Sequence, residues 1–380
     1  MLPRNYTNTI IISAVNLVEG GGLSVLRKCV QEMSQFNTEH GNAYKIIVLV
    51  HSASLLAEYG NVSYIAYPLA KKSWLFRAFY EYICFYFVSL RHKPVVWLSL
   101  HDMTPNVRAK RQYVYMHNSA PFFQKRAGLA LHWKFRLFVA LYKYLYRLNV
   151  RRNTGIIVQQ GWFRDKIADL CKVDKERIIV AYPEFKKPEH FSYDGKYTAG
   201  QFFYNSFPRD FKNFETICKA CETLAADADL CPGWKVCLTI DGTENEYSRA
   251  IVDKYRGNPH IHFCGLLSRE QCEDYYKSSE CLIFPSLLET WGLPISEFKV
   301  YGKKMILADL PYAHEAASGA DAASFFEPTD YRPLAKVMKS VIERRCEDYF
   351  SAVPRENPCP PFCDDWKKLF GKIMPRNEDV

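Results

Sequence analysis

The sequence ECLIFPSLLETWGLPISEFKVYG, residues 280–302, joins a short apolar run to a helical pattern through a turn. The run ECLIF predicts a buried strand, and the Pro and Ser after it end that strand. Because Pro294 suits the first turn of a helix, Glu289 falls on the loop and Glu297 on the helix. The stretch therefore predicts one carboxylate at the mouth of a strand and a second in the next helix. The alternative is two surface glutamates on an ordinary turn.

Apolar runs of the same kind recur along the chain between helical stretches. A first series comprises residues 8–15, 44–50, 62–67, 94–99, 112–116, 155–159 and 177–181, and a second comprises 200–205, 235–240, 260–263, 280–284, 304–308 and 323–326. Near-continuous β-branched or aromatic runs are typical of parallel strands buried on both faces of a sheet. We therefore predict an α/β protein that consists of two βαβ domains in tandem.

The predicted domains comprise residues 1–185 and 195–355. The stretch between them, from Phe185 to Gly200, is rich in Pro, Gly, Tyr and charge and suits a linker. Residues 360–380 begin in a Pro-rich turn and predict a final helix that packs back on the first domain. Ligands of open α/β sheets gather at the carboxyl ends of strands, so we expect a cleft between the two sheets to hold them.

The composition indicates a large folded chain. Of 380 residues, 48% are hydrophobic, which is enough to bury two cores. We expect neither a signal peptide nor a transmembrane segment, since the sequence has no suitable apolar run. Thirteen cysteines are spread along the chain. The closest pair, Cys218 and Cys221, lies in a helical pattern without further metal ligands, so we expect reduced, buried thiols in a cytoplasmic protein.

The positive charge is concentrated in the first half of the chain. Residues 1–180 contain 25 Lys and Arg against 10 Asp and Glu, whereas residues 181–380 contain 25 against 31. A basic half indicates anionic material nearby, which could be phospholipid, nucleic acid or a phosphorylated substrate. Charge alone does not choose among these three.

Two loops of the first domain carry candidate site residues. Gly20, Gly21 and Gly22 lie between the first strand and a helix, a context in which a phosphate can approach backbone N–H groups. A flexible turn is the alternative. His117 ends the strand 112–116, where active-site groups of such sheets are found; a structural histidine is the alternative. His101 and Asp102 end the preceding strand.

In the second domain, Arg209 and Lys212 follow the strand 200–205. Two fixed cations at the end of a strand can bind an anionic ligand, because ligands of such sheets gather at this edge. A solvated basic turn is the alternative.

The segment around Glu289 resembles the retaining GT-B glycosyltransferases of family four, also called glycosyl transferases group 1. Their signature is Glu-x7-Glu within P-S-x-x-E-x-x-G-L-P-x-x-E. The matching residues here are Pro285, Ser286, Glu289, Gly292, Leu293, Pro294 and Glu297. The sequence departs from the family at Lys303, Lys304 and Met305, where G-x-P-V is usual; we expect this change to affect which sugar is used.

The resemblance implies a GT-B architecture, with two Rossmann-like domains facing across a cleft and a nucleotide-sugar donor bound mainly by the second. It implies that the acceptor is bound mainly by the first domain, where we expect His101 and Asp102 to line the acceptor side. It implies that Glu289 contacts the transferred sugar and Glu297 the ribose, while Arg209 and Lys212 clamp the diphosphate. It further implies donor contacts from His117 and from the backbone of four residues in the glycine loop and at the helix start: Gly21, Gly22, Gly292 and Leu293. The reaction implied is retaining transfer to a glycan or lipid-linked acceptor in cell-surface polysaccharide or lipopolysaccharide biosynthesis, without a cofactor or metal.

Two segments of the basic half predict contact with an anionic membrane surface. Residues 71–93 place aromatic side chains between basic ends, and residues 132–152 place Arg and Lys on one helical face and Leu on another. We expect a cytoplasmic protein, peripheral on the inner face of the cell membrane. The alternative is that the Leu stripe packs on the sheet and the basic face is solvated.

Two other functions are compatible with parts of this pattern. A sugar-nucleotide epimerase can share the architecture, but it would require acid and base groups in both domains and no acceptor. A basic protein that binds glycan or nucleic acid without catalysis would account for the charge. We expect no nucleic acid partner, because the aromatic runs look buried and no nucleic-acid motif is present.

Overall fold

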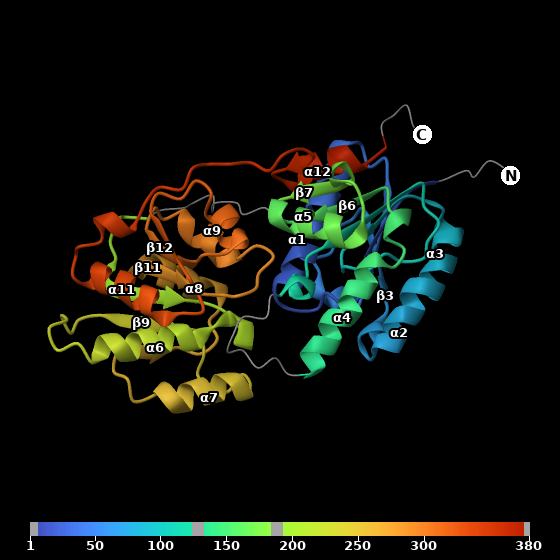
Figure 1. Ribbon diagram of the computed structural model, residues 1–380. Coiled ribbons are helices and arrows are strands. Elements are labelled where there is room, and N and C mark those ends of the chain that lie inside the picture. Colours follow the sequence, from blue (N-terminus) through green and yellow to red (C-terminus); the bar gives the residue numbers. More distant parts are fainter. Residues whose placement is uncertain (1–6, 124–132, 184–192, 376–380) are drawn as a thin grey trace. The chain divides into compact units, whose positions relative to one another are not determined.

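The computed structural model describes residues 7–123, 133–183 and 193–375 (Figure 1). These residues divide into two compact units. The first, unit 1, contains residues 7–122, 133–183 and 358–375, and the second, unit 2, contains Phe123 and residues 193–357. Within the described ranges no helix is both long and apolar enough to cross a membrane.

Unit 1 is built on a parallel sheet of eight strands in the order β14-β7-β6-β5-β4-β1-β2-β3. The strands are β1 (Thr7–Ala14), β2 (Lys45–Val50), β3 (Val62–Ala66), β4 (Pro94–Ser99), β5 (Arg111–Met116), β6 (Gly155–Val158), β7 (Ile178–Ala181) and β14 (Phe362–Cys363). All seven predicted strands of this part of the chain are present. The edge strand β14 was not predicted, because two residues within a Pro-rich turn show no period.

Helices cover both faces of this sheet (Figure 1). They are α1 (Gly20–Glu39), α2 (Trp74–Phe79), α3 (Phe85–His92), α4 (Trp133–Arg147), α5 (Gly161–Cys171) and α12 (Trp366–Ile373), with a π-helical turn, η3 (Tyr80–Cys84), between α2 and α3. Short 3-10 turns complete the unit: η1 (Ala53–Leu55), η2 (Pro68–Lys71), η4 (Ala120–Phe122), η5 (Val150–Arg152) and η6 (Lys175–Arg177).

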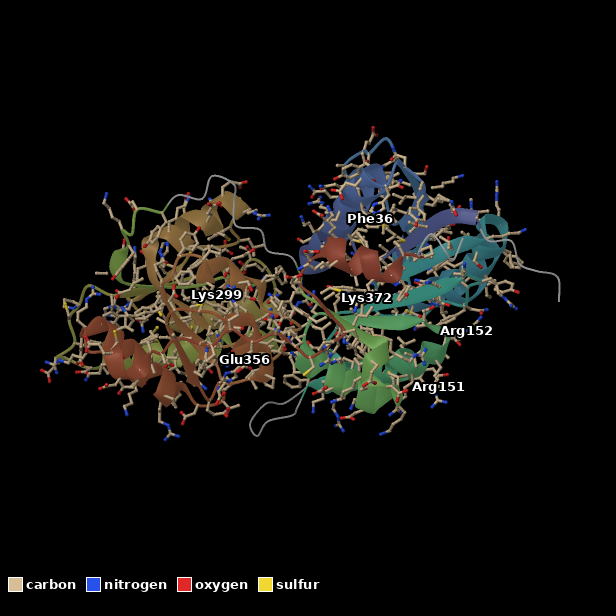
Figure 2. The ribbon with its side chains drawn as sticks, turned by 90° about the horizontal axis from the view of Figure 1, so that it is seen from above. Phe36, Arg151, Arg152, Lys299, Glu356 and Lys372 are labelled. Carbon is tan, nitrogen blue, oxygen red and sulfur yellow. The ribbon has the colours of Figure 1, made fainter. Side chains whose placement is uncertain are left out.

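Successive residues of β1 serve the two cores, because side chains alternate across a strand. Ile10 and Ile12 belong to the core that contains α1 and α12, whereas Ile11 packs with Phe85 of α3 on the other face. Figure 2 shows α12, which carries the labelled Lys372, beside the labelled Phe36 of α1. The last helix therefore completes the core of unit 1.

Unit 2 is built on a parallel sheet of six strands in the order β10-β9-β8-β11-β12-β13. The strands are β8 (Thr198–Tyr204), β9 (Lys235–Leu238), β10 (Ile261–Phe263), β11 (Ser279–Phe284), β12 (Lys304–Ala308) and β13 (Ala323–Phe326). The helices are α6 (Phe214–Ala225), α7 (Glu246–Tyr255), α8 (Arg269–Ser278), α9 (Leu293–Lys299), α10 (Pro311–Ala317) and α11 (Tyr331–Ile342), and the 3-10 turns are η7 (Asp210–Lys212) and η8 (Glu347–Tyr349).

Adjacent aromatic residues of β8 serve the two faces of this second sheet. Phe203 stacks on Tyr275 of α8, with ring centroids 4.9 Å apart, and Tyr204 contacts Phe214 of α6 at 4.8 Å. Both Cys218 and Cys221 are fully buried in α6. The prediction of two parallel α/β domains is therefore confirmed.

Candidate active site

The loops after β8 and β11 meet at the carboxyl edge of the unit 2 sheet. The backbone N–H of Leu287 donates to the carbonyl of Phe211 over 2.7 Å. The Asn213 amide, at the start of α6, donates to the carbonyl of Pro285 at 3.1 Å and to that of Pro328 at 2.8 Å. These bonds fasten η7 to the loop that follows β11, so residues far apart in the sequence are held together at this edge.

The two loops bring Lys212 and Glu289 into direct contact. The distance from Lys212 Nζ to Glu289 Oε1 is 2.5 Å, and 17% and 15% of the respective side chains are exposed. The Glu289 charge also contributes, after burial, to raising the pKa of Tyr204 and of Tyr312, which lie beneath the loop. A partly buried ion pair thus lies at the carboxyl end of β11.

Arg209 lies just before η7 and is exposed. Its guanidinium lies 5.6 Å from the centre of the Phe207 ring. Within the described part of the chain Arg209 makes no ion pair, unlike Lys212. Two cations from one loop are therefore available at this edge, one already paired and one facing solvent.

Glu297, on α9, is held by a buried tyrosine. Tyr276 of α8 donates its hydroxyl proton to Glu297 Oε2 over 2.7 Å, and the Asn205 amide donates to the same hydroxyl oxygen over 2.9 Å. Burial, and then the Glu297 charge, raises the pKa of Tyr276 well above its ordinary value, so the phenol stays a donor. Neither Tyr276 nor Asn205 was predicted as a site residue. The position of Asn205 at the end of a predicted strand is the feature of the sequence that could have indicated it.

Gly292 makes the turn between Glu289 and α9. Its φ of +85° is a conformation that residues with a side chain rarely adopt. A Cβ at this position would lie 3.2 Å from the side chain of Ile295 and 3.4 Å from the Phe284 ring. Leu293 then opens α9, with Pro294 in its first turn. The predicted loop and helix positions of the two glutamates are therefore those in the structure.

Lys303 has a structural role. Its ammonium group is buried and donates to three backbone carbonyls at the end of α8, those of Tyr276, Lys277 and Ser279. It also lies about 5 Å from the ring centres of Phe298 and Tyr301. Desolvation lowers its pKa to about 8. Lys303 thus joins α8 to α9, and these contacts do not include Glu289 or Glu297.

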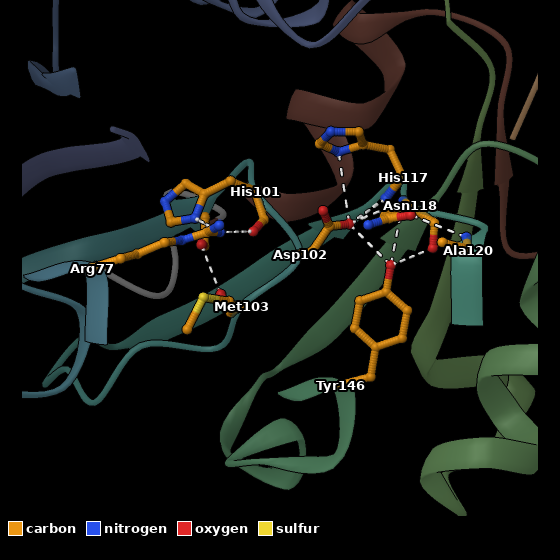
Figure 3. A network of polar contacts seen from close by, with 9 residues as sticks. Arg77, His101, Asp102, Met103, His117, Asn118, Ala120 and Tyr146 are labelled. Carbon is orange, nitrogen blue, oxygen red and sulfur yellow. Dashed lines mark hydrogen bonds and ion pairs between the residues drawn. The ribbon is translucent and has the colours of Figure 1, made fainter. Parts of the chain in front are cut away.

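In unit 1, Asp102 organises the loop that carries His117 (Figure 3). Asp102 Oδ1 accepts from the backbone N–H of His117 at 2.7 Å and of Asn118 at 3.1 Å, and the Tyr146 hydroxyl lies 3.1 Å from it. The His117 ring nitrogen Nδ1 is 3.9 Å from the same oxygen. Asp102 has a φ of +69°, a strained value for a residue with a side chain. Asp102 thus positions His117.

The glycine loop lies beside His117. Gly20, Gly21 and Gly22 form the first turn of α1, and a Cβ on Gly22 would lie 3.9 Å from His117 Nε2 and 3.1 Å from Leu17. Around Gly21 there is open space. Gly22 and His117, predicted from separate loops, are therefore neighbours at the carboxyl edge of the unit 1 sheet.

The expectation for His101 was wrong, because its side chain is fully buried and does not line a surface. Arg77 Nη2 donates to His101 Nδ1 at 3.1 Å and to the His101 carbonyl at 2.7 Å. His101 Nε2 lies 3.1 Å from Glu81 Oε1. Since Arg77 donates to Nδ1, the proton of the neutral ring belongs on Nε2.

No group of three or more His, Cys, Asp or Glu side chains within the described residues is arranged to hold a metal ion. Asp227, of the sequence Asp-x-Asp, pairs with Lys339 Nζ at 2.6 Å. It lies between α6 and β9, at the amino end of β9. This is the edge of the sheet opposite the loops that carry Lys212 and Glu289.

Two parallel α/β units with a Glu-x7-Glu segment at one sheet edge define a glycosyltransferase of the GT-B class. Residues 186–352 match the family model described as glycosyl transferases group 1. The chain is 21% identical over 266 residues to the O-antigen chain mannosyltransferase RfbU of Salmonella typhimurium, which covers 68% of this chain and 70% of RfbU. Residues 186–352 of this chain thus resemble the glycosyl transferases group 1.

Solved structures of the same fold are similar along most of the chain. WaaG, a glycosyltransferase involved in lipopolysaccharide biosynthesis, matches with a TM-score of 0.63 at 13% identity, over 89% of this chain and 92% of WaaG. Anabaena HepE in complex with UDP-glucose matches with a TM-score of 0.57 at 13% identity, over 88% and 90%. TarM matches with a TM-score of 0.50 at 12% identity over 66% of this chain, which spans only 48% of TarM.

Proposed function

We propose that the protein transfers a sugar from a nucleotide-diphosphate sugar to a glycan or lipid-linked acceptor, with retention of the anomeric configuration. The observation that carries this proposal is the pairing of Lys212 with Glu289 at the edge where α9 presents Glu297. RfbU acts on O-antigen, WaaG in lipopolysaccharide biosynthesis, and HepE was solved with UDP-glucose. These similarities support a role in the biosynthesis of a cell-surface polysaccharide or lipopolysaccharide.

Each residue of unit 2 has a distinct part in this proposal. Glu289 holds hydroxyls of the donor sugar, and Glu297 holds the paired hydroxyls of the ribose, because carboxylates accept from both. Arg209 and Lys212 bind the diphosphate. The Lys212 ammonium group, already in contact with Glu289, reaches both the sugar-binding carboxylate and the leaving group. The backbone of Gly292 and Leu293 lies between the two carboxylates and contacts the donor.

In unit 1, His117 and the backbone of Gly21 and Gly22 are proposed to contact the donor sugar and phosphates. The Asp102 carboxylate keeps the His117 loop in place. None of these side chains acts as a nucleophile in the proposed reaction. The acceptor hydroxyl forms its bond to the anomeric carbon on the face that the diphosphate leaves. The bonding electrons go to the leaving phosphate oxygen, and a phosphate oxygen takes the acceptor proton.

The reaction is proposed to need no metal, since Arg209 and Lys212 supply the positive charge that a cation would otherwise bring to the diphosphate. We place the protein in the cytoplasm. Seven of its cysteines are buried in the two units, where a thiol packs as a small apolar group. Such use of cysteine is typical of proteins in reducing compartments.

The test is steady-state kinetics in EDTA, with donor sugar as the varied substrate. Glu289→Gln should lower kcat on the order of a hundredfold and leave affinity for the free nucleoside diphosphate nearly unchanged, because its contact strengthens only as the anomeric bond lengthens. Glu297→Ala should raise donor KM roughly tenfold with a smaller effect on kcat. Glu273→Gln, on the surface of α8, is the matched control.

Wild-type kinetics in both variants would remove the proposed roles of the pair. Loss of all transfer in EDTA, restored by Mg²⁺ or Mn²⁺, would contradict the metal-free part. Conversion of the donor to an epimer without any acceptor would favour the epimerase instead.

A further inference from the structure

The helical segment 74–92, formed by α2, η3 and α3, has its polarity reversed relative to an ordinary surface helix. Its inward face carries Arg77, Glu81, Phe85 and Ser89, all buried. Its outward face carries large apolar side chains at the same spacing of four residues, namely Leu75, Phe79, Ile83 and Phe87, all exposed. Leu75 is 83% and Phe87 64% exposed. Surface helices of globular proteins show the opposite arrangement.

The π turn explains how both stripes persist along the segment. In an α-helix with 3.6 residues per turn, side chains four apart drift around the axis by about 40° at each step. A π turn closes its hydrogen bonds one residue later and so takes up an extra residue. The turn η3, at Tyr80–Cys84, falls in the middle of the segment. It removes much of the drift and keeps the apolar stripe on one side.

Helix α4 extends the exposed apolar area. Trp74 packs edge to face with Tyr142 of α4, with ring centroids 6.0 Å apart, and Figure 1 shows α4 beside α2. Leu137, Leu141 and Tyr144 of α4 are each more than half exposed. The apolar surface comprises Leu75, Phe79, Ile83, Phe87, Leu90, Leu137, Leu141 and Tyr144. A contiguous exposed area of this kind marks an interaction site.

The charges around the apolar surface identify what covers it. The single carboxylate in the two helical segments is Glu81, which is fully buried. Exposed basic residues lie at both ends and along α4: Lys71, Lys72, Arg91, Lys93, Arg136, Lys143 and Arg147. A second copy of this chain would bring these like charges together, which costs free energy. An anionic lipid surface complements both the charge and the apolar side chains.

We propose that the apolar surface docks on anionic phospholipid, with segment 74–92 and α4 lying in the plane of the membrane. The exposed Leu and Phe side chains enter the boundary between headgroups and acyl chains, and the basic residues contact lipid phosphates. The inward face joins this surface to the site loops, because Arg77 donates to the carbonyl of His101 beside Asp102. Docking therefore occurs next to the loop that carries His117.

The experiment is co-sedimentation of the full chain with vesicles of phosphatidylcholine, with and without phosphatidylglycerol. The triple variant Leu75→Glu, Phe79→Glu and Phe87→Glu removes three exposed side chains of the surface, so circular dichroism should remain that of the wild type. Leu266→Glu, an exposed leucine of unit 2, is the matched control. The wild type and the control should bind the anionic vesicles. The affinity of the triple variant for the same vesicles should be lower by a factor of roughly ten or more.

A second measurement reports the depth of contact. Acyl chains that carry bromine should quench the fluorescence of Trp74, which is half exposed at the edge of the surface, and Trp74→Phe should abolish that quenching. Equal vesicle binding by the wild type and the triple variant would overturn the proposal. Failure of the wild type to bind anionic vesicles would also overturn it. This holds whether the wild type is a monomer or a dimer that the triple substitution dissociates.

Discussion

Glu297 depends on a partner that the motif does not contain. The Tyr276 hydroxyl, itself fixed by Asn205, donates to this carboxylate from inside unit 2. The bond leaves the other carboxylate oxygen, Oε1, to accept from a ligand. Tyr276 is therefore a positioning residue, which acts on the donor only through Glu297.

We expect Tyr276→Phe to raise donor KM roughly tenfold and to leave kcat less affected, because a hydrogen bond to a charged group is worth about 1.5–3 kcal/mol. Binding of the free nucleoside diphosphate should weaken in parallel, a change that lost stability alone would not produce. The measurement combines kinetics with diphosphate titration. Tyr275→Phe, the same change one residue earlier on α8, is the control. Identical behaviour of the two variants would refute the positioning role.

A single lysine shows how a departure from a family pattern can have a local cause. Lys303 belongs to the departure from the family pattern that leaves the identity of the sugar open. Its ammonium group satisfies carbonyls at the end of α8, where a helix leaves its last acceptors without internal partners. One of those carbonyls is that of Tyr276, so any influence on the donor passes through this backbone.

At the scale of elements, segment 74–92 combines an apolar outer face with a charged inner one. Arg77, His101 and Glu81 form a buried chain in which the neutral histidine lies between a guanidinium and a carboxyl group. Burial raises the pKa of Glu81 to about 8, although the Arg77 charge opposes the change. This side chain therefore links the stability of unit 1 to pH.

The sign of that dependence follows from the two states. Unfolded, Glu81 has a pKa of about 4.3, so between pH 5 and 8 the folded state binds more protons than the unfolded one. The free energy of unfolding must then fall as the pH rises. Relative to Glu81→Gln, which cannot titrate, the wild type should lose on the order of 3 kcal/mol over this range. Urea denaturation at a series of pH values measures the difference.

The control for this experiment is Glu39→Gln. Hydrogen bonding to Lys367 lowers the pKa of Glu39, so this carboxylate stabilises the fold above its unfolded pKa and loses that effect in acid. The difference in the free energy of unfolding between the wild type and Glu39→Gln should therefore stay constant between pH 5 and 8. A flat difference between wild type and Glu81→Gln would show that Glu81 is ionised in the folded protein.

At the scale of the whole molecule, the chain returns to unit 1 at its end. Residues 358–375 supply the edge strand β14 and the helix α12, whose Trp366, Leu369, Phe370 and Ile373 lie in the core with α1. Strand β14 pairs with β7. Unit 1 is thus completed only after residues 193–357 of unit 2 have been synthesised.

We expect Phe370→Ala to destabilise unit 1 by about 3–5 kcal/mol, the usual cost of removing a fully buried phenylalanine side chain. Unit 2 should keep its stability, because Phe370 has its contacts within unit 1. Hydrogen exchange read by mass spectrometry separates the two units. Lys367→Ala, on the exposed side of α12, should leave the stability of unit 1 close to that of the wild type. Equal loss of protection in both units would contradict the expected independence.

Features that depend on residues close in the sequence could be predicted, whereas those that depend on residues far apart in the sequence could not. All thirteen predicted strands are present, because buried parallel strands consist of local runs of β-branched and aromatic residues. The π turn of segment 74–92 was not predicted, since one extra residue per turn hardly changes an apolar pattern. His101 was misplaced because the direction of a side chain at a strand end depends on Arg77, which lies 24 residues away.

By itself, the sequence determined the fold class, the resemblance to glycosyl transferases group 1 and the loop and helix positions of Glu289 and Glu297, since short patterns of burial and turn chemistry encode all three. Only the tertiary structure decided which side chains meet. Lys212 contacts Glu289 across 77 residues, and Tyr276 contacts Glu297 across 21. The first pair forms because parallel strands bring their carboxyl ends to one edge of a sheet, and the second because α8 and α9 both pack against β11. No local pattern records which side chains then come within hydrogen-bonding distance.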